Sequence, residues 1–266
     1  SLDFLCKVVN PDGASLGHLP PPCIGLGVVD YMVGSVHHAH GIPIDFDADT
    51  FHKAVAHGGA QDAAGYASLL HAYLDAQLEV LDRLRPEVVG HFDLYRLFAP
   101  NAPWMSGDAG DALRGKVERN IRFAASYGAL FEANSSAFRK GWDGETYPGR
   151  EILRMIRSVH GRIALSDDSH GVQQVGLNYH RLHDYLEHEG VDEIWYLERD
   201  PAPRSSDPAK LWDEFRESEA VREQNASRDD VGAHAPRTFP RGARAHVLRD
   251  WRAAPFWRSA GPALHS

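Results

Sequence analysis

The stretch ALSDDSH (residues 164–170) ends an apolar run in two carboxylates and an imidazole. Asp168 and His170 are two residues apart, so both side chains would point the same way from an extended strand end. Side chains placed like this at the carboxyl end of a strand are typical of metal and catalytic sites on α/β scaffolds. A polar turn that caps a helix uses the same residue types, so this motif alone leaves both interpretations open.

Two other apolar runs end in the same way, because residues 28–36 lead into His37 and His38, and residues 88–90 lead into His91. If these runs are parallel strands, their carboxyl ends meet at one rim and bring the imidazoles together. Neutral imidazole and carboxylate are ligands that zinc, iron and manganese accept. The sequence therefore predicts a divalent-metal site at this rim. The rim would carry these side chains: His37, His38, His91, Asp93, Asn134, Arg139, Asp167, Asp168 and His170.

Two cations, Arg139 and Lys140, follow another apolar run at residues 129–134. A guanidinium is a bidentate partner for phosphate, so Arg139 is a candidate for binding a small phosphorylated substrate. A solvated surface charge explains Arg139 equally well and explains Lys140 better. No G-x-G-x-x-G motif follows a strand-like run, so a dinucleotide site is unsupported.

The composition narrows the class of partner. The 266 residues, 43% of them hydrophobic, are typical of one large globular domain or two small ones. A formal net charge of -9 disfavours nucleic acid and anionic membrane surfaces as partners. Two cysteines cannot form a disulfide framework, and no apolar run is long enough for a membrane span. We therefore expect a protein of the cytoplasm that binds neither nucleic acid nor membranes.

The apolar runs alternate with segments of helical periodicity, which indicates an α/β fold with parallel strands. The expected helices cover residues 61–84, 111–127, 149–160 and 176–189, and the last expected strand covers residues 191–197. Residues 1–27 are predicted to be an irregular loop because residues 10–27 are rich in Pro and Gly. We expect residues 28–200 to form the folded unit and residues 201–266 a mostly irregular tail with one helix over 208–224.

Four segments together resemble the histidinol-phosphatase type of the PHP (polymerase and histidinol phosphatase) family, especially its fungal form. They are GSVHHAHGIPIDFD, VVGHFDLYRLF, FEANSSAFRKGWDGETYP and IALSDDSHGVQQVGLNY, and they span roughly residues 28–200. The resemblance implies a distorted (β/α)7 barrel and a cluster of divalent ions (zinc, iron or manganese) at its rim. It also implies hydrolysis of L-histidinol phosphate to L-histidinol in histidine biosynthesis, with a metal-bound hydroxide as the expected nucleophile.

The resemblance assigns roles to individual residues. It implies that the metal ligands are His37, His91, Asp168 and His170, and that Arg139 and Asn134 bind the substrate. The family pattern opens with an H-x-H strand, a T-[DE]-H motif and a metal-bridging glutamate, and none of these precedes residue 28. We therefore expect a partial barrel that lacks its first βα units, with weak metal affinity and little or no activity by itself. The alternatives are another PHP-type phosphoesterase and a non-catalytic remnant or interaction protein.

Overall fold

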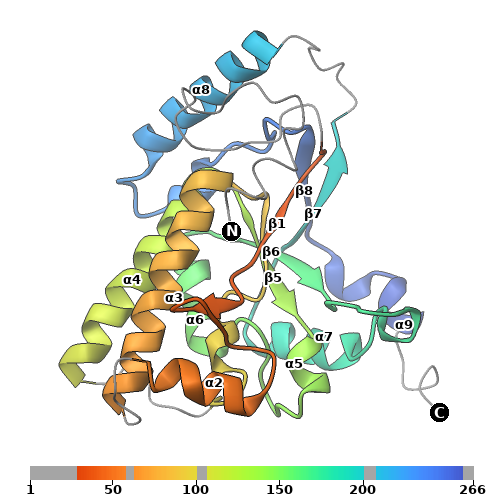
Figure 1. Ribbon diagram of the computed structural model, residues 1–266. Helices are drawn as coiled ribbons and strands as arrows, with labels where there is room; N and C mark the ends of the chain where they lie inside the picture. Colours follow the sequence, from red (N-terminus) through yellow and green to blue (C-terminus); the bar gives the residue numbers. More distant parts are fainter. Residues whose placement is uncertain (1–28, 58–62, 101–106, 201–207, 260–266) are drawn as a thin grey trace.

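A four-stranded parallel sheet forms the centre of this mixed α/β protein (Figure 1). The computed structural model describes residues 29–57, 63–100, 107–200 and 208–259. The sheet order is β1-β4-β5-β6, and every neighbouring pair is parallel. The strands are β1 (Val33–Gly34), β4 (Val88–Val89), β5 (Leu130–Asn134) and β6 (Arg162–Ser166). The predicted α/β class and its parallel strands are confirmed.

Helices connect these strands, as parallel pairing requires. The predicted alternation of strand and helix is confirmed, with α2 as an additional helix between β1 and β4. The helices up to β7 are α2 (Ala48–Val55), α3 (Ala63–Leu84), α4 (Gly107–Ser126), the short α5 (Ser136–Arg139), α6 (Arg150–Ser158) and α7 (Tyr179–His188). No helix among the described residues is both long and apolar enough to cross a membrane.

Successive strand residues point to opposite sides of the sheet, and apolar residues occupy both sides. Val89, Phe131 and Ile163 belong to the large core that the helices build, with α3 and α4 packed side by side (Figure 1). Val88 and Leu130 instead belong to a smaller cluster on the other face, together with residues from beyond position 200. Burial on two faces is typical of parallel sheets and explains why these strands read as continuous apolar runs.

A short hairpin follows β1 and carries residues toward the rim. Its strands are β2 (His38–Ala39) and β3 (Ile42–Pro43), which pair antiparallel. The turn between them places His40 and Gly41 at φ 54° and 74°. Left-handed backbone of this kind favours glycine, and a Gly in the second turn position makes the tight reversal possible.

The last expected strand does not join the parallel sheet. Instead β7 (Ile194–Arg199) pairs antiparallel with β8 (Ala243–Leu248), in a register that sets Leu197 opposite Ala245. The strand predicted over residues 191–197 is thus confirmed as β7, but in the part of the chain that the structure describes the parallel sheet has four strands and β7 is not one of them. The partner strand comes from the region that the sequence predicts to be irregular, which is why local patterning does not reveal this pairing.

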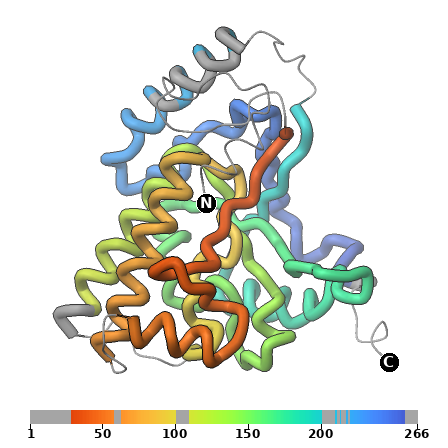
Figure 2. Tube along the Cα trace, viewed as in Figure 1, coloured from red at the N-terminus to blue at the C-terminus, as the bar shows by residue number. Residues whose placement is uncertain are grey.

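The region after residue 200 contains more regular structure than its composition predicts. The expected helix is confirmed as α8 (Pro208–Asn225), and β8 and the short α9 (Phe256–Ser259) follow it. Figure 2 shows this region (blue) returning to the beginning of β1. Trp251 is fully buried, and Arg241 forms a buried ion pair with Glu87. The predicted loop over residues 1–27 lies outside the described residues.

Candidate functional site

Two histidines meet where β1 and β4 end. His37 lies three residues beyond β1, and His91 lies two residues beyond β4. Their rings pack edge to face with the centroids 4.8 Å apart. This arrangement follows from the parallel pairing of the two strands, whose carboxyl ends point the same way. The structure therefore brings together two of the imidazoles that the sequence places at this rim.

Asp45 orients the ring of His37. The Nδ1 atom of His37 lies 2.7 Å from Oδ2 of Asp45, which the β2–β3 hairpin carries back to the rim. Burial opposes ionisation of Asp45, but the hydrogen bond and charge of His37 outweigh it and lower the pKa of this carboxyl. A carboxylate on Nδ1 fixes the ring and leaves Nε2 for a ligand. Asp45 is not among the site residues predicted from the sequence, although a carboxylate that closely follows a histidine cluster is a signal for such a role.

His91 is a neutral imidazole at pH 7. Burial and, to a lesser extent, the neighbouring His37 lower its pKa to about 4, although the charge of Asp168 opposes both. The ring is 6% exposed, and its Nδ1 atom is buried without a hydrogen-bond partner. A buried polar atom without a partner is uncommon in folded proteins and calls for an explanation. Neutral imidazole is the form that binds a metal ion, so the chemistry of His91 fits a ligand.

A half-buried carboxylate, Glu132 of β5, is bonded to the backbone of His91. Its Oε2 atom accepts hydrogen bonds from the backbone N–H of His91 (3.2 Å) and from Nδ2 of Asn134 (3.0 Å). Burial raises the pKa of Glu132, while its hydrogen bonds with Asn134, His91 and Ser166 oppose that rise. Glu132 is not among the site residues predicted from the sequence, although a carboxylate inside the apolar run LFEA is a signal for a functional or positioning role.

Asn134 uses both ends of its side-chain amide within the protein. Its Nδ2 donates to Glu132, and its Oδ1 accepts from the backbone N–H of Ser136 at 2.9 Å. The residue is fully buried. In this structure Asn134 positions the carboxylate of Glu132, and its predicted contact with substrate stays a prediction.

The two carboxylates after β6 have different environments. Asp167 accepts from the backbone N–H groups of Ser169 (3.0 Å) and Gly176 (2.5 Å), so it stabilises the turn. Asp168, at φ 51°, is the carboxylate whose charge acts on His91. The guanidinium of Arg139 donates to the carbonyl oxygens of Asp167 (2.5 Å) and Asp168 (3.0 Å). Arg139 thus holds the backbone that presents Asp168.

His170 is exposed and is tied to its own loop. Its Nδ1 atom lies 2.8 Å from the carbonyl oxygen of Asp168, and its backbone N–H donates to Gln174 at 3.0 Å. Among the residues that the structure describes, no three His, Cys, Asp or Glu side chains are arranged to hold a metal ion. The four-residue ligand set of the sequence analysis therefore stays a prediction.

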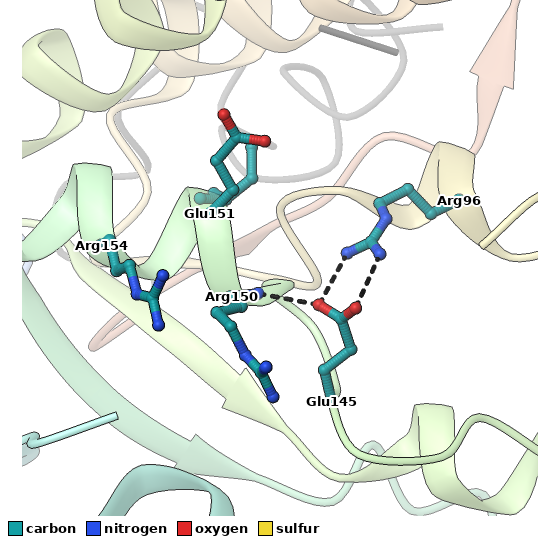
Figure 3. A pocket seen from close by; sticks show the side chains of 6 residues that line it. Arg96, Glu145, Arg150, Glu151 and Arg154 are labelled. Carbon is teal, nitrogen blue, oxygen red and sulfur yellow. Dashed lines mark hydrogen bonds and ion pairs between the residues drawn. The ribbon is translucent and has the colours of Figure 1, made fainter. Parts of the chain in front are cut away.

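Asp93, expected at the rim, takes part in a buried ion pair. Its Oδ2 atom accepts from Nη1 of Arg96 (3.1 Å) and from the backbone N–H of Gly149 (2.9 Å). Arg96 also pairs with Glu145 at 3.3 Å, as Figure 3 shows from the side of a neighbouring surface pocket. The pocket has a volume of about 440 Å³ and is lined by Arg96, Glu145, Arg150, Glu151, Ile152 and Arg154. Asp93 and Arg96 therefore both belong to an ion-pair network with Glu145.

No family model matches this chain, but it is similar to the following two proteins. A probable histidinol-phosphatase of Schizosaccharomyces pombe is 41% identical over 179 residues, which are 65% of this chain and 55% of the relative. A histidinol-phosphatase of Saccharomyces cerevisiae is 34% identical over 199 residues, 67% of this chain and 58% of the relative. The chain thus spans a little more than half the length of these relatives. The resemblance found in the four sequence segments is confirmed: over about two thirds of its length, this chain is similar to histidinol-phosphatases.

Proposed function

We propose that this chain carries part of the active site of a metal-dependent phosphomonoesterase, which converts L-histidinol phosphate to L-histidinol in histidine biosynthesis. The observation that carries the proposal is the His37–His91 pair at adjoining strand ends, within reach of the charge of Asp168. It occurs in a chain that is similar to two histidinol-phosphatases. The parallel sheet would be part of a distorted (β/α)7 barrel of the PHP type, to which further βα units would belong.

The residues at the rim suit a divalent ion. Neutral imidazoles and a carboxylate are the donors that zinc, iron and manganese accept, and the unpartnered Nδ1 of His91 is consistent with a missing partner. In the proposal the ligands are His37, His91, Asp168 and His170. A bound divalent ion would neutralise charge on the phosphoryl group and activate water for its hydrolysis.

The surrounding residues prepare these ligands. Burial keeps His91 neutral, and Asp45 fixes the ring orientation of His37. Glu132 anchors the backbone of His91, and Arg139 anchors the backbone at Asp168. Removal of a residue that positions a metal ligand typically lowers metal affinity or activity by about 10–100-fold.

The test combines metal binding with turnover. We expect the purified chain to bind Zn²⁺ in calorimetry and to release inorganic phosphate slowly from L-histidinol phosphate when Zn²⁺ or Mn²⁺ is added. His91→Ala should lose both properties, whereas His188→Ala, which removes an exposed histidine of α7, should keep them. Zn²⁺ affinity that is equal in the two variants, together with no metal-dependent phosphate release, would refute the proposal.

A further inference from the structure

Of the two cations that follow β5, Lys140 is the better placed to meet an anionic substrate. We propose that Lys140 contacts the phosphate group of the substrate, while Arg139 positions Asp168. The inference rests on the proposed function and deepens it, because it assigns the anion-binding role at the same rim. It differs from the sequence analysis, which gives the phosphate to Arg139 and leaves Lys140 as solvated surface charge.

Arg139 already uses its guanidinium within the protein. Two of its nitrogens donate to two consecutive carbonyl oxygens, those of Asp167 at 2.5 Å and Asp168 at 3.0 Å. Hydrogen bonds from a charged donor are about twice as strong as neutral ones. A phosphate that displaced them would also release the left-handed turn at Asp168. Arg139 is therefore a positioning residue.

Lys140 lies at the rim and belongs to the same cluster. Its Nζ atom is 5.9 Å from the centroid of the Tyr147 ring, and that ring lies 6.3 Å from the ring of His91. The carboxylates of Asp168 and Asp45 act electrostatically on its ammonium group. The side chain is exposed, yet enough protein surrounds the ammonium to lower the pKa of Lys140.

Several polar groups around Lys140 are already bonded within the protein. His37 is bonded to Asp45, and both ends of the Asn134 amide are occupied. In the described part of the chain, no carboxylate lies within ion-pair distance of Lys140. An ammonium is a compact point charge with three donors, and it binds phosphate without the planar geometry that a guanidinium requires.

Tyr147 explains how this flexible side chain is held. Tyr147 is fully buried, its ring is near both Lys140 and His91, and its backbone carbonyl accepts from the backbone N–H of Asn134 at 2.6 Å. An ammonium over an aromatic face is attracted by the ring quadrupole. The Tyr147 ring thus attracts the ammonium of Lys140, whose charge also acts on His91.

The test measures binding of inorganic phosphate separately from turnover. Phosphate is titrated into the zinc-loaded chain and followed by calorimetry, for the wild type, Lys140→Ala and Lys140→Arg. Lys53→Ala, which removes an exposed lysine of α2, serves as the matched control. We expect Lys140→Ala to weaken phosphate binding by roughly tenfold to a hundredfold, with Lys140→Arg retaining most of the affinity. The melting temperature and Zn²⁺ affinity of Lys140→Ala should stay at wild-type values.

Arg139→Ala should give the opposite pattern, with weaker Zn²⁺ binding because the turn that presents Asp168 is released. Phosphate affinity of Lys140→Ala equal to that of Lys53→Ala would overturn the inference and leave the proposed function standing. Phosphate binding that depends on Lys140 in a chain without turnover would support the inference and count against the proposed function. A wild-type chain that binds no phosphate overturns the inference.

Discussion

Replacing Arg241 by methionine should strongly destabilise the protein. Nη1 of Arg241 lies 2.9 Å from both carboxylate oxygens of Glu87 and donates to the carbonyl oxygen of Arg85 at 2.7 Å. The side chains of this pair are 2% and 1% exposed. Glu87 also accepts from the backbone N–H of Met32 at 2.8 Å. One carboxylate therefore joins the region after residue 200 to the beginnings of β1 and β4.

The magnitude follows from the buried charge that Arg241→Met leaves behind. Removal of one partner of a buried ion pair typically costs about 3–5 kcal/mol. For a chain of this size that loss corresponds to roughly 6–20 °C in melting temperature. Arg241→Met should therefore melt far below the wild type at pH 7.5.

The defect should depend on pH in a defined direction. Burial raises the pKa of Glu87, and Arg241 opposes the rise, so the pKa should rise further in Arg241→Met. A carboxyl with a raised folded-state pKa binds more protons in the folded than in the unfolded chain. Its stability contribution is therefore present below the usual carboxyl pKa and is lost as the pH rises through the folded pKa. The defect should be larger at pH 7.5 than at pH 5.

Urea unfolding followed by circular dichroism at pH 7.5 and pH 5 tests this reasoning. The double variant Glu87→Gln/Arg241→Met should recover part of the loss at pH 7.5, because it buries no charge. Arg244→Met, which changes an exposed arginine of β8, should shift the free energy of unfolding by no more than about 0.5 kcal/mol. Equal stability of Arg241→Met and Arg244→Met, or a larger defect at pH 5, would refute the assigned role of the ion pair.

Three further changes test other parts of the structure. Arg162→Leu should lower the free energy of unfolding in urea by about 3 kcal/mol or more, because the guanidinium donates to three backbone carbonyl oxygens and stacks on Trp195; a loss under about 1 kcal/mol would contradict this. Asp45→Asn should weaken Zn²⁺ binding in calorimetry about tenfold by removing the anionic partner of His37, and unchanged affinity would exclude that role. Trp251→Ala should cost about 3–5 kcal/mol in the same urea assay, because the side chain is fully buried; wild-type stability would show that this region does not contribute to the core.

The elements that the sequence predicts correctly are those set by local patterning. Leu69, Leu70, Tyr73 and Leu74 repeat at helical spacing, and all four are buried on α3. The pairing of β7 depends instead on β8, which lies about fifty positions further along the chain in a charged, Arg-rich region. β8 itself is mostly apolar, but the charged residues around it hide a strand that packs on one face of the sheet.

The site shows the same division between topology and side-chain chemistry. His37 and His91 meet because parallel neighbours end at one rim, which the order of apolar runs already indicates. The roles of Asp45, Glu132 and Arg139 depend on which hydrogen-bond partner lies nearest after folding. A motif specifies that an arginine follows a strand, but it does not distinguish a guanidinium that binds substrate from one that holds a turn.

The rim depends on the region after residue 200 because β1 is short and lies at an edge of the sheet. This strand lies at an edge of the four-stranded sheet, and its ladder with β4 consists of two residue pairs. So short an edge strand has little intrinsic stability, and Glu87 fixes its beginning through Met32. Because Arg241 neutralises Glu87 in the interior, the position of His37 at the other end of β1 depends on a residue 154 positions beyond Glu87. Any loss of that ion pair should therefore loosen the His37–His91 contact before it disturbs the helices on the opposite face.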